Sequence, residues 1–236
     1  MRRVAFWLVV LSLLAFFAVA LGGRSVWFPM YARVRGKRTI DEVIREYGPG
    51  AQARLVPFFE RAGVAYPPAS ITLLGFKAER RLELWARQGD IEHLVRAWPV
   101  LAASGEPGPK LREGDRQVPE GRYRIAALNP NSSYHLSLQL DFPNAFDRAR
   151  AAEEKRAPGG EIFIHGKDKS VGCLAIGDEA IEELFTLVER VGLEHVEVVL
   201  APRDLRDGVR PVLTDDAPAW TGELYDDLAH ALARYR

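Results

Sequence analysis

The chain has 236 residues, 32 basic and 32 acidic side chains, and a single cysteine. A hydrophobic fraction of 47% and a charged fraction of 27% are ordinary for a globular protein, so general disorder is excluded. Zero formal net charge gives no support to nucleic-acid binding, and one cysteine excludes an internal disulfide framework. The five scattered histidines lack the paired spacing of a metal site, and no metal or other cofactor is expected.

The first 23 residues have the pattern of a targeting segment. Arg2 and Arg3 precede an apolar run, residues 4–23, whose only polar member is Ser12. The run matches the roughly 20 residues that cross a bilayer, and Ala18-Val19-Ala20 also fits a signal-peptidase site. A cleaved signal peptide and an uncleaved anchor helix in the inner membrane both stay open. In either case we expect the rest of the chain in the cell envelope, on the periplasmic side.

Residues 24–69 are predicted to form a helical linker segment. Helical spacing from Ile40 to Tyr47 predicts one helix that ends at Gly48-Pro49-Gly50, and a second short helix is predicted over residues 51–62. Pro67 and Pro68 mark a boundary, because the residue before a proline avoids the helical region. The main domain is therefore predicted to span residues 70–236.

Short runs of β-prone residues dominate that domain. A hairpin is predicted from residues 71–76 and 82–86, and a further strand over residues 93–104 is interrupted by Pro99, which indicates a sheet edge. The other expected elements are a loop over 105–121, alternating strands over 122–142, a helix from Asp178 to Gly192, a strand from His195 and a final helix from Thr221. This pattern predicts an α+β, mainly β fold that closes as a small β-sandwich or barrel with flanking helices.

The candidate chemistry lies in residues 161–173, EIFIHGKDKSVGC. A β-prone run ends in His165 and Gly166, and a polar turn leads back to Cys173. A strand can therefore present the imidazole at its tip while the turn returns the thiol beside it. An imidazole in that position can accept the thiol proton and leave a thiolate, the form of sulfur that attacks carbonyl carbon. The alternative is a cysteine that serves only as a small buried hydrophobic residue.

The pattern H-G followed by S-x-G-C resembles the active-site signature of the L,D-transpeptidase catalytic domain, also called the YkuD domain. The segments GPKLREGDRQVPEGRYRI, LNPNSSYHLSL, FPNAFDRA, IHG and SVGCLAIGDEAIEEL occur in the order typical of that family, over roughly residues 67–199. The chain is most similar to a cell-envelope subgroup that acts on peptidoglycan and includes an amidase that releases a lipoprotein from meso-diaminopimelate. The resemblance implies a β-sandwich with outer helices, peptidoglycan stem peptides as substrates and a wall-attached lipoprotein as a partner.

The same resemblance assigns roles to four residues. It makes Cys173 the nucleophile and His165 the general base, with the backbone carbonyl of Gly166 orienting the imidazole. Gly172 is expected in the oxyanion region, where backbone amides around the nucleophile stabilise the tetrahedral intermediate.

Five further residues are candidates for substrate contacts: Ser170, Lys167, Tyr134, His135 and Asn144. Lys167 can attract stem-peptide carboxylates, although a solvated loop explains it equally well. His135 is equally well explained as a hydrogen-bonded structural histidine, and Asn144 as part of an Asx turn.

Two departures from the family pattern bear on the reaction. Typical members carry histidine at the position of Val171 and an arginine soon after the cysteine, where this chain has Leu174. Loss of these groups favours hydrolysis of a meso-diaminopimelate-linked amide, such as a protein-to-wall attachment, with water as acceptor. An L,D-transpeptidase that forms cross-links or protein attachments is one alternative. A non-catalytic wall-binding module is another. The inner membrane is a partner only if the leader is uncleaved, and no nucleic acid is expected.

Overall fold

The computed structural model describes residues 36–213 and 217–236, and residues 40–236 form one compact unit. The predicted leader, residues 1–23, and the start of the predicted linker lie outside the described residues. No helix within the described ranges is both long enough and apolar enough to cross a membrane.

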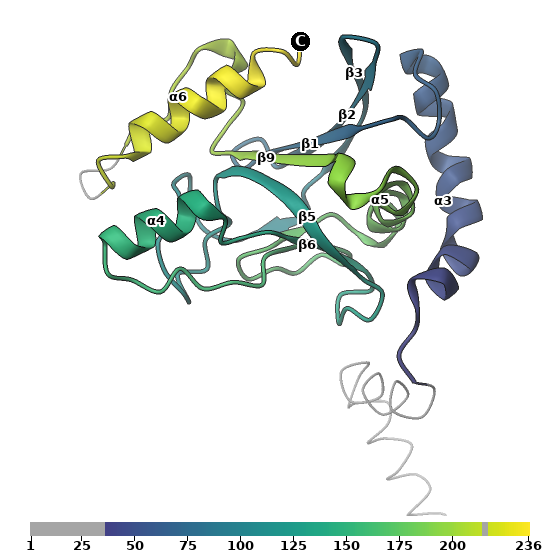
Figure 1. Ribbon diagram of the computed structural model, residues 1–236, viewed down its shortest axis with the longest axis horizontal. Helices are drawn as coiled ribbons and strands as arrows, with labels where there is room; N and C mark the ends of the chain where they lie inside the picture. The colour runs from purple at the N-terminus through teal and green to yellow at the C-terminus, as the bar shows by residue number, and fades with distance from the viewer. Residues whose placement is uncertain (1–35, 214–216) are drawn as a thin grey trace, which may run out of the picture. The chain divides into compact units, whose positions relative to one another are not determined.

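One mixed sheet organises the unit (Figure 1). Across the described residues its nine strands run in the order β3-β2-β1-β9-β5-β6-β7-β8-β4. Their bounds are β1 Ile71–Phe76, β2 Arg81–Gln88, β3 Ile91–Pro99, β4 Ala102–Ala103, β5 Gly121–Asn129, β6 Ser137–Leu140, β7 Phe163–His165, β8 Leu174–Ala175 and β9 Val196–Ala201. The predicted β1–β2 hairpin is confirmed. The strand predicted over residues 93–104 is divided after Pro99 into β3 and β4, which form the two opposite edges of the sheet.

The sheet is curled rather than split into two layers, because β5 belongs to both halves. Residues 121–124 of β5 pair with β9, and residues 125–129 pair with β6, with a bulge between Ile125 and Ala127. A bulge bends a strand and increases its twist, so the hydrogen-bonded ladder turns around the core without a break. The predicted α+β class is confirmed. Of the two predicted ways of closing the sheet, the curled sheet is closer to a half-open barrel than to a two-layer sandwich.

Helices cover both faces of this sheet. They are α3 Ile40–Ala62, α4 Ala145–Glu153, α5 Asp178–Val191 and α6 Thr221–Leu232, with two short 3-10 helices, η1 Leu193–His195 and η2 Leu205–Asp207. In Figure 1, α3 and α5 lie on one side of the strands and α4 and α6 on the other.

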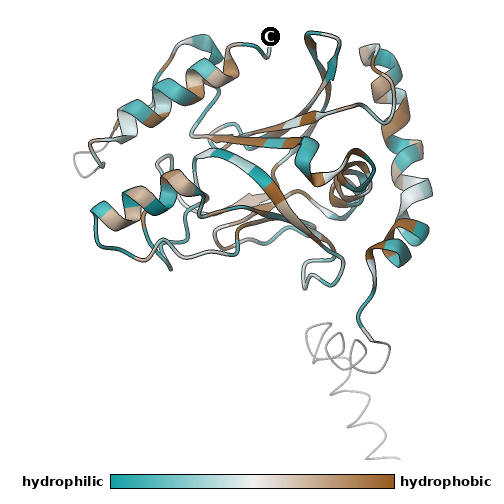
Figure 2. Ribbon diagram, viewed as in Figure 1, coloured by the Kyte–Doolittle hydropathy of each residue, from teal (hydrophilic) through white to brown (hydrophobic). Residues whose placement is uncertain are grey.

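Strand β9 shows how the two faces are filled. Val196, Val198 and Leu200 join the main core with α5, whereas Val199 and Ala201 pack with α6 in a second core. Because successive side chains of a strand point to opposite faces, a strand covered on both faces is mostly apolar. The exception in β9 is Glu197, which is only partly buried and binds Arg122 and Arg234. Figure 2 shows this concentration of hydrophobic residues along the central strands and α5.

Helix α3 is continuous where the sequence predicts a break. It includes Pro49 and Pro57, and Gly48 is buried. A Cβ atom on Gly48 would lie 3.3 Å from Ile44 Cγ2 and 3.8 Å from Thr186 Cγ2. Glycine therefore lets α3 approach α5 closely, and this tertiary contact outweighs the local helix-breaking propensity.

A fully buried carboxylate joins α5 to its neighbours. Glu183 accepts hydrogen bonds from Arg54 Nε at 2.8 Å, Trp98 Nε1 at 3.0 Å and Arg96 Nη1 at 3.2 Å. These donors come from α3 and β3, so one charge connects two helices and the edge strand. A buried charge is tolerated when its hydrogen-bonding capacity is satisfied in this way.

We expect Glu183→Ala to lower the free energy of unfolding by about 3–5 kcal/mol, because it leaves buried donors and cationic groups without their partner. The measurement is urea denaturation of the full chain followed by circular dichroism. Glu179→Ala, at an exposed position of the same helix, is the matched control and should change stability by less than about 0.5 kcal/mol. Equal losses for the two variants would contradict a structural role for the buried carboxylate.

Candidate active site

The parallel pairing of β7 with β8 brings Cys173 and His165 to the same face of the sheet. Ile164 pairs with Leu174 and His165 pairs with Ala175. Cys173 immediately precedes β8, and side chains two residues apart along a strand share a face. The thiol and the imidazole therefore project from the same face of neighbouring strands as diagonal neighbours.

The surroundings of His165 determine which ring nitrogen carries the proton. The side chain is buried, and its Nδ1 lies 2.7 Å from the carbonyl oxygen of Gly166. A carbonyl oxygen can only accept, so Nδ1 is the protonated nitrogen of the neutral ring and Nε2 is left as the acceptor. The ring of Tyr134 stacks on the imidazole with 4.4 Å between centroids and fixes its plane.

Gly166 has no room for a side chain. A Cβ atom there would lie 2.6 Å from Asp178 Oδ1 and 2.7 Å from the carbonyl oxygen of Tyr134. Asp178 is the first residue of α5, and its side chain accepts the backbone N–H of Lys167 at 2.8 Å. The strand that carries His165 thus ends in a tightly packed turn.

Burial shifts the pKa of both reactive groups in the direction that favours their neutral forms. Burial raises the pKa of the Cys173 thiol above its ordinary value of 9.0, partly offset by a hydrogen bond from the backbone of Phe163. Burial lowers the pKa of His165 below 6.5, and the nearby Lys167 ammonium acts in the same direction. The half-buried thiol lies 3.9 Å from the carbonyl oxygen of Glu161. The arrangement is a thiol and an imidazole, so proton transfer must accompany attack by the sulfur.

Two serine hydroxyls hold the turn before Cys173. Ser170 Oγ accepts the N–H of Cys173 at 2.9 Å and donates to its carbonyl oxygen at 2.6 Å. Ser104 Oγ accepts the N–H of Gly172 at 2.5 Å and donates to the carbonyl oxygen of Arg116 at 2.7 Å. The role predicted for Gly172 in the oxyanion region stays a prediction. In this structure the amides of Gly172 and Cys173 are bound to serine oxygens that a substrate oxygen would have to displace.

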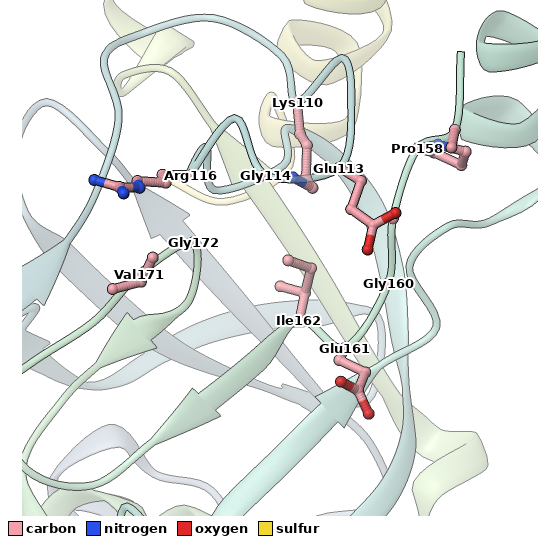
Figure 3. Close-up of a pocket in the computed structure, with 12 residues that line it drawn as sticks. Lys110, Glu113, Gly114, Arg116, Pro158, Gly160, Glu161, Ile162, Val171 and Gly172 are labelled. Carbon is pink, nitrogen blue, oxygen red and sulfur yellow. The ribbon is translucent and has the colours of Figure 1, made fainter.

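A cleft of about 560 Å³ opens beside this turn (Figure 3). It lies between the loop that carries Lys110, Glu113 and Arg116 and the segments 157–162 and 171–172. The sequence pattern placed a charged Gly/Pro-rich loop at residues 105–121 but singled out none of its charged residues. The available signal was the segment GPKLREGDRQVPEG within the family resemblance, which carries no information on which charges face the nucleophile.

A buried ion pair anchors the cleft loop, residues 105–121, to the rest of the domain. Lys77 Nζ lies 3.0 Å from Glu120 Oε1 and donates to the carbonyl oxygen of Gly108 at 2.9 Å. Glu120 in turn accepts the N–H of Gly108 at 2.8 Å and the hydroxyl of Tyr225 at 2.8 Å. These contacts anchor the start of the loop to β1 and α6.

The other predicted contact residues fall into two groups. Tyr134 and Lys167 lie beside His165, with Lys167 Nζ 5.6 Å from the centre of the Tyr134 ring and hydrogen-bonded to the carbonyl of Ser133. His135 points instead to α5, where its Nε2 lies 2.9 Å from Glu182 Oε1, and Asn144 caps α4 in a capping box with Asp147. The contacts of His135 and Asn144 are those of the structural alternatives. Among the described residues, no group of three or more His, Cys, Asp or Glu side chains is arranged to hold a metal ion.

The fold and the site together define the class of protein. Residues 72–209 match the model of the YkuD family, the L,D-transpeptidase catalytic domain. The match covers more than half of the chain, so the chain belongs to this family, and the family predicted from the motifs is confirmed.

Individual relatives are more distant. The chain is 36% identical over 137 residues to the protein named "Putative L,D-transpeptidase YafK" from Escherichia coli K12, a match that covers 56% of this chain and 54% of the relative. The chain thus spans about half the length of the curated relatives it matches. Among solved structures, the helical cell shape determining protein Pgp2 from Campylobacter jejuni is 21% identical with a TM-score of 0.48, covering 57% of this chain and 48% of that one. Bd1075 from Bdellovibrio bacteriovorus is 18% identical with a TM-score of 0.42, covering 71% and 60%.

We expect Ser104→Ala to loosen the turn before Cys173, because it removes both hydrogen bonds that join this turn to the cleft loop. The free energy of unfolding should fall by about 1–2 kcal/mol, and iodoacetamide should modify Cys173 faster than in the wild type. Urea denaturation and intact mass measure the two effects. Ser133→Ala, at an exposed site, is the control. An unchanged alkylation rate would show that the Ser104 bridge does not restrain the turn.

The raised pKa of Cys173 predicts how its alkylation depends on pH. Because burial raises the pKa of the Cys173 thiol, the second-order rate constant with iodoacetamide should keep rising from pH 6 to pH 9 without a plateau. It should show no inflection near pH 6.5, because the pKa of His165 is lowered. Cys173 is the only cysteine, so intact mass reports it directly. A plateau below pH 8 would reveal a resting thiolate–imidazolium pair instead. Slow alkylation at neutral pH is therefore expected of an active enzyme as well as of a non-catalytic module.

Proposed function

We propose that this protein is a cysteine-dependent acyl-transfer enzyme of the cell envelope that acts on peptidoglycan stem peptides. The reaction we favour is hydrolysis of an amide formed by meso-diaminopimelate, such as the bond that attaches a protein to the wall. The observation that carries the proposal is the paired register of β7 and β8. This register supports an imidazole with an unprotonated Nε2 on the same face as a half-buried thiol, and Gly172, the residue before the thiol, lines an open cleft.

The chemistry follows from the two neutral groups. The sulfur of Cys173 attacks the carbonyl carbon of the scissile amide while Nε2 of His165 accepts the thiol proton. As the C–N bond breaks, the imidazolium returns this proton to the departing amine, and a thioester remains on Cys173. Water then adds to the thioester carbon, with His165 accepting its proton. Collapse of the second intermediate releases a carboxylic acid and the thiol.

The carbonyl of Gly166 supports this assignment without taking part in bond changes. Its hydrogen bond with Nδ1 holds the tautomer in which Nε2 is the base and stabilises the imidazolium while it exists. Burial lowers the pKa of the ring, so the base is in its active form at neutral pH. General-base assistance of this type contributes about 10²- to 10⁴-fold to the rate.

The acceptor in the second half-reaction separates hydrolysis from transpeptidation. Val171 is 67% exposed beside the cleft and Leu174 is buried, and both stand where the family typically has polar groups. Without polar groups at these two positions, the site has fewer contacts for an incoming amine, and this favours water as the acyl acceptor. The family name itself favours the alternative, an L,D-transpeptidase that forms cross-links or protein attachments. Of the five predicted contact residues, Tyr134 and Lys167 remain candidates, because they lie at His165.

The decisive experiment uses muropeptides that carry a peptide joined through its lysine to meso-diaminopimelate, incubated with the full chain in H₂¹⁸O. Hydrolysis is expected to release the lysine amine and to introduce one ¹⁸O into the new carboxylate. Cys173→Ala should abolish release, and His165→Gln should reduce it by about 10²- to 10⁴-fold. His195→Gln, at a half-exposed histidine beyond α5, is the matched control and should retain full activity.

Mass analysis distinguishes the rival functions in the same reaction. New dimers, or incorporation of an added labelled amine without ¹⁸O, would establish transpeptidation instead. Equal binding to the wall by wild type and Cys173→Ala, without any change in the muropeptides, would favour the non-catalytic module.

A further inference from the structure

The loop between β5 and β6, residues 130–136, connects His165 with the neighbouring helices. On one side the Tyr134 ring stacks on the His165 imidazole, with 4.4 Å between the ring centroids. On the other side the next residue, His135, contacts α3 and α5, two helices that run alongside each other in Figure 1. Two consecutive residues of one loop therefore join the predicted general base to the helices.

The imidazole of His135 is held by side chains from both helices. Its Nε2 lies 2.9 Å from Glu182 Oε1 of α5, and because a carboxylate can only accept, Nε2 carries a proton and donates it. The other oxygen of Glu182 pairs with Arg54 Nη2 of α3 at 2.9 Å. The Tyr47 ring of α3 meets the imidazole edge-on, with centroids 5.0 Å apart. The side chains of His135 and Glu182 are only 16% and 14% exposed, so water weakens their hydrogen bond less than it would at an open surface.

The backbone of His135 is strained where the two side chains diverge. Its φ of 76° lies in the left-handed region, which is costly for a residue with a Cβ. The N–H of Tyr134 donates to Ser132 Oγ at 3.1 Å, and Lys167 Nζ binds the carbonyl oxygen of Ser133. A strained turn persists only where the surrounding contacts fix it, and the contact of His135 with α5 is one of these.

The same loop also lies against the residue that fixes the tautomer of His165. The N–H of Gly166 donates to the carbonyl oxygen of Leu136 at 3.2 Å, and a Cβ atom on Gly166 would lie 2.7 Å from the carbonyl oxygen of Tyr134. Gly166 in turn accepts the hydrogen bond of His165 Nδ1. A shift of the loop would therefore change both the ring that stacks on the imidazole and the carbonyl that holds its proton.

We propose that His135 is a positioning residue for the general base His165, acting through Tyr134 by anchoring the β5–β6 loop to α5. A general base must lie within hydrogen-bond reach of the proton that it accepts, and a displacement of about 1 Å can cost about 10²-fold in rate. The inference rests on the proposed function, because it concerns the base of that reaction.

The first test observes the imidazole of His165 directly and needs no turnover. The full chain is labelled with ¹⁵N-histidine and purified in mild detergent, and His165→Gln identifies the signals of this ring. In the wild type we expect the tautomer with the proton on Nδ1. His135→Gly removes the ring contacts and relieves the left-handed backbone, so the variant is expected to fold. It should shift the His165 signals and speed solvent exchange of the Nδ1 proton by about 10-fold or more.

The second test follows the reaction with muropeptides. His135→Gly should lower kcat about 10- to 100-fold and change KM by less than about twofold, because the base is misplaced while the cleft is intact. Iodoacetamide should modify Cys173 at the wild-type rate, which separates a misplaced base from a disturbed nucleophile. A purely structural histidine would instead lower activity only in proportion to the loss of folded protein, measured by circular dichroism.

Substitutions of the partner carboxylate test the hydrogen bond itself. Glu182→Ala should reproduce the spectral shift and the loss of kcat, whereas Glu182→Gln, whose amide oxygen can still accept from His135 Nε2, should restore most of both. Glu179→Ala, at an exposed position of the same helix, is the matched control and should match the wild type.

The inference is overturned if His135→Gly leaves the His165 signals and kcat unchanged, if Glu182→Ala behaves as the wild type, or if Glu182→Gln loses as much as Glu182→Ala. If the spectral changes occur but the wild type releases no amine from muropeptides, the positioning role stands and the proposed hydrolysis fails. If the wild type releases the amine and His135→Gly does so equally fast, the proposed function stands alone.

Discussion

Strand β8 is the element on which the site depends, because it pairs with β7 on one side and with β4 on the other. The parallel pairing with β7 sets the face and the offset of His165 relative to Cys173. The antiparallel pairing with β4 brings Ser104, and behind it the cleft loop, to the turn that carries the nucleophile. A two-residue strand has little stability of its own, so its position relies on the sheet that surrounds it.

The polar groups of the turn around the nucleophile are hydrogen-bonded within the protein. Ser170 and Ser104 bind the amides of Cys173 and Gly172, while the Gly166 carbonyl accepts the hydrogen bond of the imidazole. These contacts restrain the turn, and burial favours the neutral forms of the thiol and the imidazole. The cost appears at the oxyanion position, where a substrate oxygen must exchange with a serine hydroxyl before the amides can stabilise developing charge.

Charges in this fold separate into two kinds. The buried ones, Glu183 between α3 and α5 and Glu120 beneath the cleft loop, are fully paired, as burial requires. Among the charged residues that line the cleft, Arg116 and Glu113 are exposed to solvent. This division follows from desolvation. A charge removed from water must be paired within the protein, whereas a charge at an open surface is solvated by water and needs no partner.

The sequence by itself determined the family, the β1–β2 hairpin and the short segment that carries both the cysteine and the histidine. These features are local or carried by motifs. Alternation of apolar residues reports which face of a strand is buried, and Tyr123, Ile125 and Leu138 are buried as that pattern predicts. His165 and Cys173 lie within one short strand–turn–strand segment, so their proximity needs little more than local geometry.

Only the tertiary structure decided the curl of the sheet, the continuity of α3 and the make-up of the cleft. Each depends on contacts between segments far apart in the chain: the switch of β5 from β9 to β6, the approach of Gly48 to Thr186, and the pairing of β4 with β8. Local periodicity is the same whichever strand a given strand pairs with. It could not reveal that the backbone of Arg116 would lie beside Gly172 or that His135 would contact Glu182. Packing and hydrogen-bond satisfaction over the whole domain settle those choices, because they are properties of the assembled core and not of any one segment.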